Sequence, residues 1–208
     1  MMRDRFFALP PDSGDAVSRG EPEELGDFAD GEWTVHLGAA RGSRRSVTLS
    51  RSGKLALPFG GFRLDVRKQI AISSDSGLIE LSWRIANAED RELDAFFASE
   101  FNLTVLGPGD PAVGLRTDSG AVMGLSEAML LSDIDWLTVF NRRDGWRLEF
   151  AFGGKPNSVA QYPVRTLSQS EGGVDRTYQA TCIMPAWPLN LPPGGVAEFS
   201  LDLTLSTE

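Results

Sequence analysis

Sulfur and imidazole are scarce in this chain of 208 residues, which has one cysteine, Cys182, and one histidine, His36. A single cysteine excludes an intramolecular disulfide framework and any metal cluster held by several thiolates. Cys182 lies between Thr181 and Ile183 in a strand-like run. We therefore expect a buried, unreactive thiol rather than a nucleophile.

Long apolar runs are also absent. No stretch approaches the roughly 20 apolar residues that a membrane-spanning helix needs. Near the N-terminus, a short apolar run at 6–9 is ended by two prolines, unlike a secretory signal. We therefore expect a soluble protein in the cytoplasm with no membrane partner. The net charge of -9 argues against nucleic acid as a partner, because phosphate binding depends on concentrated Lys and Arg.

Catalytic motifs are missing as well: there is no phosphate-binding glycine loop, no GxSxG elbow and no dinucleotide fingerprint. A mutarotase-type reaction needs an acid–base pair, usually a carboxylate and a histidine. His36 lies in phase with the polar residues of its segment, so we predict a solvated histidine on a strand. Asp133 and Asp135 have a spacing that fits glycoside hydrolysis or calcium ligation, as do many of the 29 acidic residues. We expect no catalytic residue, no metal site and no cofactor.

What the sequence does contain is alternation. Twenty-two glycines and twelve prolines separate short segments of alternating polarity, which is typical of antiparallel β-proteins. Over 199–205 every second residue is apolar, and the same period recurs over 79–85 and 146–152. This period of two is incompatible with an amphipathic helix. The pattern predicts an all-β protein, a single domain over 1–208, with at most short helical turns.

Turn chemistry predicts two hairpins. Asp144-Gly145 supplies the left-handed geometry that a hairpin loop needs, so 135–140 should pair with 146–152. Asp75-Ser76-Gly77 should close a second hairpin between the segments on either side of it.

Helical signals are few. Ser126 can cap one turn over 126–131, where Ala, Met and Leu favour a helix, and both interpretations of this segment stay open. The segment 12–24 is acidic, contains glycine and has no period, so we predict a loop.

Three groups of motifs resemble one family. They are DRFF and ELGDF within 4–28, FASEFNLTVLG at 97–107, and RTLSQSEGGVDRTYQATCIMPAWP at 165–188. In this order they resemble the β-sandwich domain at the C-terminal end of family-57 glycoside hydrolases, of the 4-α-glucanotransferase and α-amylase type. The resemblance covers about 4–205. The chain departs from the family pattern at Arg5, where a histidine is typical.

The resemblance implies a large antiparallel β-sandwich similar to the galactose-mutarotase-like supersandwich, with a broad concave sheet. In that family the catalytic carboxylates lie on an upstream barrel domain. We therefore expect a non-catalytic accessory domain that packs on a catalytic barrel domain, in cis or in trans, and contacts an α-glucan or starch-like oligosaccharide. Two alternatives stay open: a free-standing mutarotase-like enzyme using Glu100 or Glu171 with His36, and a structural or homodimerising module without a ligand.

Glu100 and Asn102 are the first candidates for carbohydrate binding. Alternation places them on the polar face of the strand 95–105, about 6.6–6.8 Å apart. A carboxylate and an amide suit hydroxyl recognition, because together they accept and donate hydrogen bonds. The alternative, which we favour, is that Glu100 pairs with an arginine from a neighbouring strand, such as Arg84.

Further candidates come from the motifs of the resemblance. Gln169 and Glu171 lie in a polar, glycine-ended segment that would face a catalytic barrel or a glucan, or simply connect two strands. Gln179 belongs to the same pattern. Among the tryptophans, Trp83 and Trp146 lie on apolar phases and predict core positions. Trp187, near several prolines, is the tryptophan we expect to be exposed, as a sugar platform or as a cover for the sandwich rim.

Overall fold

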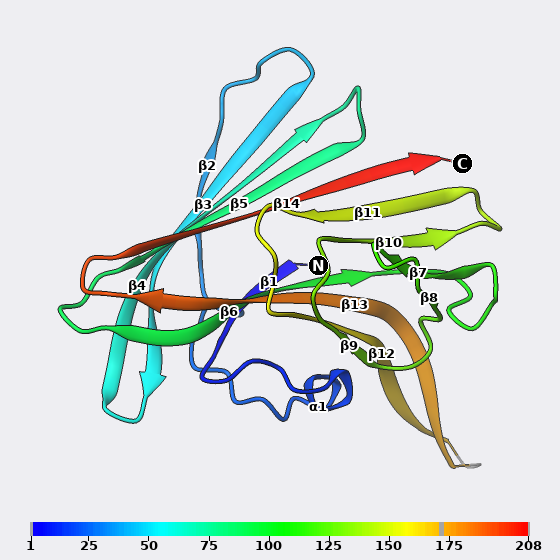
Figure 1. Ribbon diagram of the computed structural model, residues 1–208, viewed down its shortest axis with the longest axis horizontal. Helices are drawn as coiled ribbons and strands as arrows, with labels where there is room; N and C mark the ends of the chain where they lie inside the picture. Colours follow the sequence, from blue (N-terminus) through cyan, green and yellow to red (C-terminus); the bar gives the residue numbers. More distant parts are fainter. Residues whose placement is uncertain (1, 171–172, 208) are drawn as a thin grey trace.

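The computed structural model describes residues 2–170 and 173–207, and in this part of the chain the strands form a five-stranded and a nine-stranded sheet (Figure 1). The elements are β1 Met2–Phe7, α1 Gly14–Ser18, β2 Thr34–Leu37, β3 Arg44–Leu57, β4 Gly60–Ser73, β5 Leu78–Asn87, β6 Leu93–Leu103, β7 Val113–Thr117, β8 Val122–Met123, β9 Met129–Leu131, β10 Trp136–Asn141, β11 Trp146–Phe152, β12 Ser158–Ser170, β13 Gly173–Leu191 and β14 Val196–Thr207.

The strand order is β1-β6-β13-β12-β9 in the smaller sheet and β2-β3-β4-β5-β14-β11-β10-β7-β8 in the larger sheet. Neighbouring strands pair antiparallel, for example β4 with β5 and β6 with β13. The predicted all-β antiparallel sandwich is confirmed. Among the described residues, no helix is long and apolar enough to cross a membrane.

The hydrophobic core lies between the sheets because the long strands alternate. In β4, Phe62, Leu64 and Val66 are buried, while the residues between them are exposed. Fully burying each such side chain contributes about 1.5–3 kcal/mol. The alternation therefore fixes which face of β4 packs inward, as the sequence predicts.

An aromatic cluster joins the two sheets at the middle of this core. Phe97 of β6 and Trp187 of β13 stack with ring centroids 6.0 Å apart and an interplanar angle of 19°. From the larger sheet, Trp83 lies 5.8 Å from Phe97, and Phe199 lies 5.4 Å from Trp187. Such pairs contribute about 0.5–1.5 kcal/mol beyond the burial of their area.

Both predicted hairpins are confirmed. Residues 136–141 of β10 pair with 146–151 of β11, and Gly145 has a φ of 66°. In the turn, the Asp144 backbone amide donates to Asn141 Oδ1 at 3.0 Å. The β4–β5 hairpin turns at Gly77, where a Cβ would lie 2.5 Å from the backbone oxygen of Leu205. Glycine is therefore required there by space as well as by its φ of 63°.

The helical turn is not where the sequence suggested. Residues 129–131 form strand β9, which pairs with β12, so the helical interpretation of 126–131 is wrong. The prediction of a loop over 12–24 is wrong in part, because this segment contains α1. Ser13 caps α1 by accepting from the Ala16 amide at 3.0 Å. Strand pairing at the sheet edge outweighs the local helix propensity of 126–131.

The outer face of the smaller sheet is covered too. A second cluster of buried side chains contains Phe7, Tyr162 and Cys182, with Val17 of α1 packed against it. This cover explains why Ala98, on the face of β6 that we predicted to be polar, is buried. α1 therefore covers part of the outer face of the smaller sheet, which would be open in a bare two-sheet sandwich.

A buried ion pair connects the sheets. Lys68 Nζ on β4 lies 2.7 Å from Asp4 Oδ2 on β1, and both side chains are almost completely buried. Trp83 Nε1 and Ser99 Oγ each donate to Asp4 Oδ1 at 3.1 Å. The Lys68 ammonium also lies 5.2 Å from the ring centroid of Trp33, as a cation–π contact.

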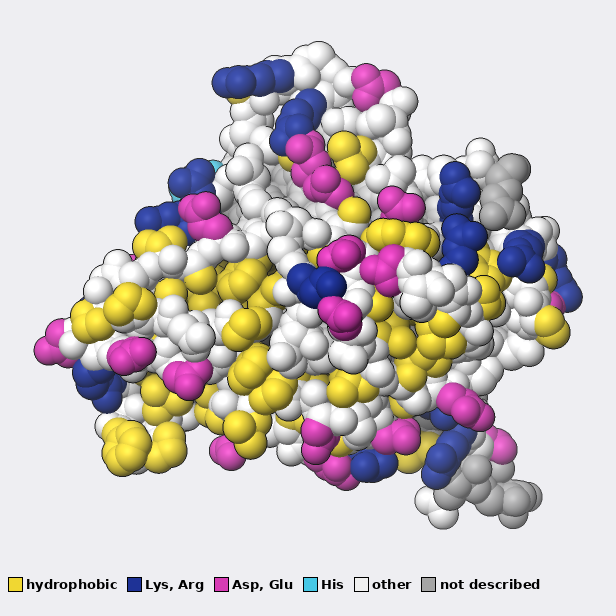
Figure 2. All heavy atoms as spheres, viewed as in Figure 1, with side chains coloured by type: hydrophobic (Ala, Val, Ile, Leu, Met, Phe, Trp, Pro, Cys, Tyr) yellow, Lys and Arg dark blue, Asp and Glu magenta, His cyan; other side chains and the backbone are white. Residues whose placement is uncertain are grey.

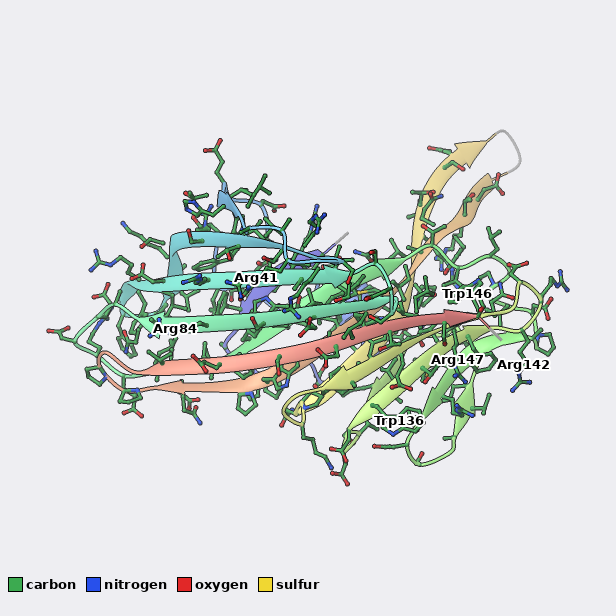
Figure 3. All side chains as sticks on the ribbon, turned by 90° about the horizontal axis from the view of Figure 1, so that it is seen from above. Arg41, Arg84, Trp136, Arg142, Trp146 and Arg147 are labelled. Carbon is green, nitrogen blue, oxygen red and sulfur yellow. The ribbon has the colours of Figure 1, made fainter. Side chains whose placement is uncertain are left out.

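The distal parts of β12 and β13 leave the sandwich. In Figures 1 and 3 they form a two-stranded ribbon that projects away from both sheets. In its described part Leu167 is 67% exposed. We call residues 165–170 and 173–179 the ribbon.

Candidate functional site

Glu100 is held by an arginine from the neighbouring strand. Arg5 Nε on β1 donates to Glu100 Oε2 at 2.7 Å, and Arg5 Nη1 donates to Glu24 Oε2 at 2.6 Å. Asn102 Nδ2 donates to the other oxygen of Glu100 at 2.5 Å. The favoured interpretation of Glu100 as an ion-pair partner is confirmed, but its partner is Arg5 and not Arg84.

Burial controls the electrostatics of this cluster. It raises the pKa of Glu24 above its ordinary value, although the ion pair with Arg5 acts in the opposite direction. Burial by itself would lower the pKa of Arg5. The carboxylates of Glu100 and Glu24 outweigh this effect and raise the pKa of Arg5 above its ordinary value. Glu100 is only 8% exposed. The structure thus brings Glu100 and Asn102 together, hydrogen-bonded to each other, with Glu100 buried and Asn102 half-buried.

The position of Trp187 differs from the expectation of an exposed rim residue. Its side chain is 2% exposed, and its Nε1 donates to the backbone oxygen of Gly154 at 2.8 Å. Trp187 therefore belongs to the core, as Trp83 does. Trp146 is half-buried, so its predicted core position is confirmed only in part.

The remaining sequence-predicted residues lie on the ribbon. Gln169 and Gln179 are exposed, and Gln179 Nε2 donates to Thr166 Oγ1 at 3.1 Å. Glu171 lies outside the described residues. Gln169 and Gln179 therefore lie on a different part of the smaller sheet from Glu100.

His36 is exposed on β2, at an edge of the larger sheet, as its sequence pattern predicts. Glu100 is buried on the smaller sheet, where its carboxylate accepts from Arg5 and Asn102, so the structure does not bring it together with the exposed His36. Asp133 and Asp135 share Lys155, whose Nζ lies 2.7 Å and 3.6 Å from them. Within the described residues, no group of three or more His, Cys, Asp or Glu side chains is arranged to hold a metal ion.

An apolar cleft opens between the two sheets beside the beginning of β1. It encloses about 500 Å³. Its lining consists of Asn102, Leu103, Thr104 and Val105 from the end of β6 and beyond, with Trp146, Leu148, Leu205 and Thr207 from β11 and β14. Leu205 is 54% exposed although it lies on the apolar phase of β14. Alternation predicts its face correctly but does not reveal that the opposite sheet ends at this point.

Comparison with known proteins identifies the family of this chain. Residues 1–201 match the family described as alpha-amylase/4-alpha-glucanotransferase, C-terminal. The chain belongs to this family. The family resemblance inferred from the sequence is therefore confirmed.

Two relatives are longer proteins, and the chain matches each of them over part of its length. An alpha-amylase from Pyrococcus abyssi is 24% identical over 193 residues, which cover 91% of this chain and 24% of the relative. A 4-alpha-glucanotransferase from Thermococcus litoralis superposes with a TM-score of 0.71 at 21% identity, over 98% of this chain and 27% of that protein. The chain thus spans about a quarter of the length of either relative.

The fold is shared with other solved structures. A galactose mutarotase-like protein from Clostridium acetobutylicum superposes with a TM-score of 0.66 at 10% identity, over 100% of this chain and 79% of that chain. At this identity the likeness shows the fold alone. It confirms the mutarotase-like sandwich that the resemblance implied.

In this member of the family, Cys182 provides a test of the covered face. Cys182 is buried, and burial raises its pKa to about 12. Almost none of the thiol is therefore ionised at pH 8. We expect Ellman's reagent to label the native protein only as fast as the protein unfolds, and labelling to accelerate in urea.

The matched control for this labelling experiment is an exposed thiol in the same protein. The double variant Cys182→Ala, Ser168→Cys places it on the ribbon, where Ser168 is exposed. This variant should react at the rate of a free cysteine. Equally rapid labelling of Cys182 in the parent protein would contradict the covered face.

Proposed function

We propose that this chain is a non-catalytic accessory domain of an α-glucan-acting enzyme, and that it packs on the catalytic domain through the apolar cleft. The observation that carries the proposal is the apolar lining of this cleft, in which Leu205 is 54% exposed and Trp146 and Leu148 are half-buried. Contiguous apolar surface of this kind marks a site of association in soluble proteins. Figure 2 also shows hydrophobic side chains exposed between charged ones on one side of the molecule.

The position of the cleft supports a catalytic domain as its occupant. Met2 pairs with Phe101, so an antiparallel continuation of β1 would run beside 102–105, which forms one wall of the cleft. The family description places this domain at the C-terminal end of amylases and glucanotransferases. A catalytic domain that precedes it, as we propose from this description, would begin beside the cleft.

The ribbon supplies a second contact with the catalytic domain or its glucan. A two-stranded hairpin without further packing is marginally stable in water. The exposed side chains of Leu167, Gln169 and Gln179 combine an apolar contact with amide groups for hydrogen bonding. Docking of the ribbon would bury Leu167 and leave the amides to bind sugar hydroxyls.

Photo-crosslinking in the source cells tests this proposal. A benzoylphenylalanine in place of Leu205 should cross-link to peptides of an α-glucan-acting catalytic domain. The matched control is benzoylphenylalanine in place of Asp202, which lies on the outer face of the same strand and should give no such product. Cross-links from position 205 only to a second copy, only to an unrelated protein, or to nothing would contradict the proposal.

The charge variant Leu205→Asp gives the same test in quantitative form. A carboxylate buried in an apolar interface loses its hydration without gaining a partner. We expect the affinity for the cross-linked catalytic domain to fall at least about tenfold, measured by titration calorimetry. Asp202→Asn should leave it unchanged, and equal affinities for both variants would exclude the cleft as the contact.

A further inference from the structure

A polar groove of about 370 Å³ lies on the outer face of the larger sheet, away from the cleft and the ribbon. Its side walls come from three neighbouring strands. They contribute Arg67 and Gln69 from β4, Ser82 and Arg84 from β5, and Glu198 and Ser200 from β14. The alternation of these strands predicts that each of these side chains faces outward, but nothing in the sequence places β14 beside β5.

The register brings two arginines directly opposite each other in this groove. Arg67 pairs with Arg84 across β4 and β5, and like charges in that arrangement destabilise a sheet. Arg84 Nε lies 3.8 Å from Glu198 Oε1, and both side chains are largely exposed. Within residues 2–170 and 173–207, the side chain of Arg67 makes no hydrogen bond or ion pair, while its backbone pairs with β3 and β5. Its guanidinium donors are therefore available to a ligand, and oxygen acceptors placed between the arginines would reduce their repulsion.

The end wall of the groove is bare backbone held from below. The Gly153 amide donates to the Ser200 carbonyl at 3.0 Å, and the Gly154 carbonyl accepts from Trp187 Nε1 at 2.8 Å. A Cβ at Gly153 would lie 1.8 Å from Ser200 Oγ, so a side chain there would have to displace that hydroxyl. The same aromatic core that buries Trp187 thus fixes the end wall of the groove. A fixed, concave site loses little entropy when it binds a ligand.

The chemistry of the lining selects the class of ligand. Arg67, Arg84 and Gln69 donate hydrogen bonds, Glu198 accepts them, and the serines do both. A carboxylate beside the arginines disfavours a polyanion, whereas alternating donors and acceptors match the hydroxyls of a sugar. The volume lies within the range of small-molecule sites.

We propose that this groove binds a short, neutral α-glucan segment, as a second binding site that is separate from the catalytic domain. The choice of glucose units rests on the proposed function, while the choice of a neutral polyhydroxylated ligand rests on the groove itself. Such a site would hold a glucan chain near the enzyme while the catalytic domain acts on another part of the same chain.

Titration with maltotriose, followed by the amide NMR spectrum of the full chain, tests the proposal. We expect shifts at 67–69, 82–84, 153–154 and 198–200, with millimolar affinity. Arg84→Ala should weaken binding at least about tenfold, because it removes a charged donor. Gly154→Phe should do the same by filling the groove, since a Cβ at this position meets nothing within 4 Å.

The matched control is Arg147→Ala, which removes an arginine from the outer face of β11, outside the groove (Figure 3). It should bind maltotriose as the parent does. Absence of binding, shifts confined to the ribbon, equal affinities in all variants, or a preference for inorganic phosphate over maltotriose would each overturn the proposal. Cross-linking from position 205 does not depend on the groove, so its outcome separates failure of this site from failure of the accessory function.

Discussion

Replacement of Trp187 by alanine should lower the free energy of unfolding by about 3–5 kcal/mol. The substitution removes a side chain that is 2% exposed and leaves a cavity among aromatic rings. It also leaves the Gly154 carbonyl, which accepts at 2.8 Å, without its donor. Urea denaturation followed by circular dichroism measures this loss.

Leu167→Ala is the control for Trp187→Ala. Leu167 lies on the ribbon and is 67% exposed, so its truncation should change the free energy of unfolding by less than about 0.5 kcal/mol. If Trp187→Ala cost no more than this control, Trp187 would be a rim residue, and the end wall of the groove would lose its support.

The second large effect concerns the ion pair between the sheets. Lys68→Met leaves the Asp4 carboxylate buried without its cation, while Trp83 and Ser99 still donate to it. Removing one partner of a buried pair costs about 3–5 kcal/mol. We expect a loss of this size in urea denaturation, and partial recovery in the double variant Asp4→Asn, Lys68→Met, because no uncompensated charge remains.

The exposed pair of Lys155 with Asp133 is the control for the buried pair. Because water screens such pairs, Lys155→Met should leave the unfolding midpoint unchanged. An equally small effect of Lys68→Met would mean that water reaches Asp4, and that the two sheets are less tightly joined at β1 than the contacts of Lys68 indicate.

The sequence predicts the sheets well because alternation is a local property. The apolar phases of β4 and β14, the turns at Gly77 and Gly145, and the buried thiol of Cys182 all follow from residue order alone. These features need no knowledge of which strand lies beside which. The family resemblance adds the type of sandwich.

Trp187 could not be placed correctly from residue order, because the nearby prolines indicate a turn. In the structure β13 continues through Pro188, whose neighbour on the β6 side is Phe96. The pairing of β12 with β13 begins at Ser158 and Ala186, so Pro188 has no partner strand on that side. A proline is tolerated in such a position, and Trp187 therefore remains inside the strand.

The groove and the cleft depend on long-range arrangement. The outward phase of Arg67 and Arg84 is visible in the sequence, but the approach of Glu198 requires β14 to lie beside β5. The cleft depends on where the smaller sheet ends relative to Leu205. Likewise, the pairing of Arg5 with Glu100 depends on β1 lying beside β6. None of these distances is encoded within a single segment.

The accessory role is tested most directly by hydrogen exchange on the complex with the catalytic domain that position 205 captures. We predict that amides of 103–105 and 205–207 exchange at least about tenfold more slowly in the complex than in the free domain. Amides of 64–68 on β4, which does not line the cleft, should be unchanged. Equal exchange of 103–105 and 205–207 with and without the catalytic domain would contradict an accessory domain that docks through its cleft.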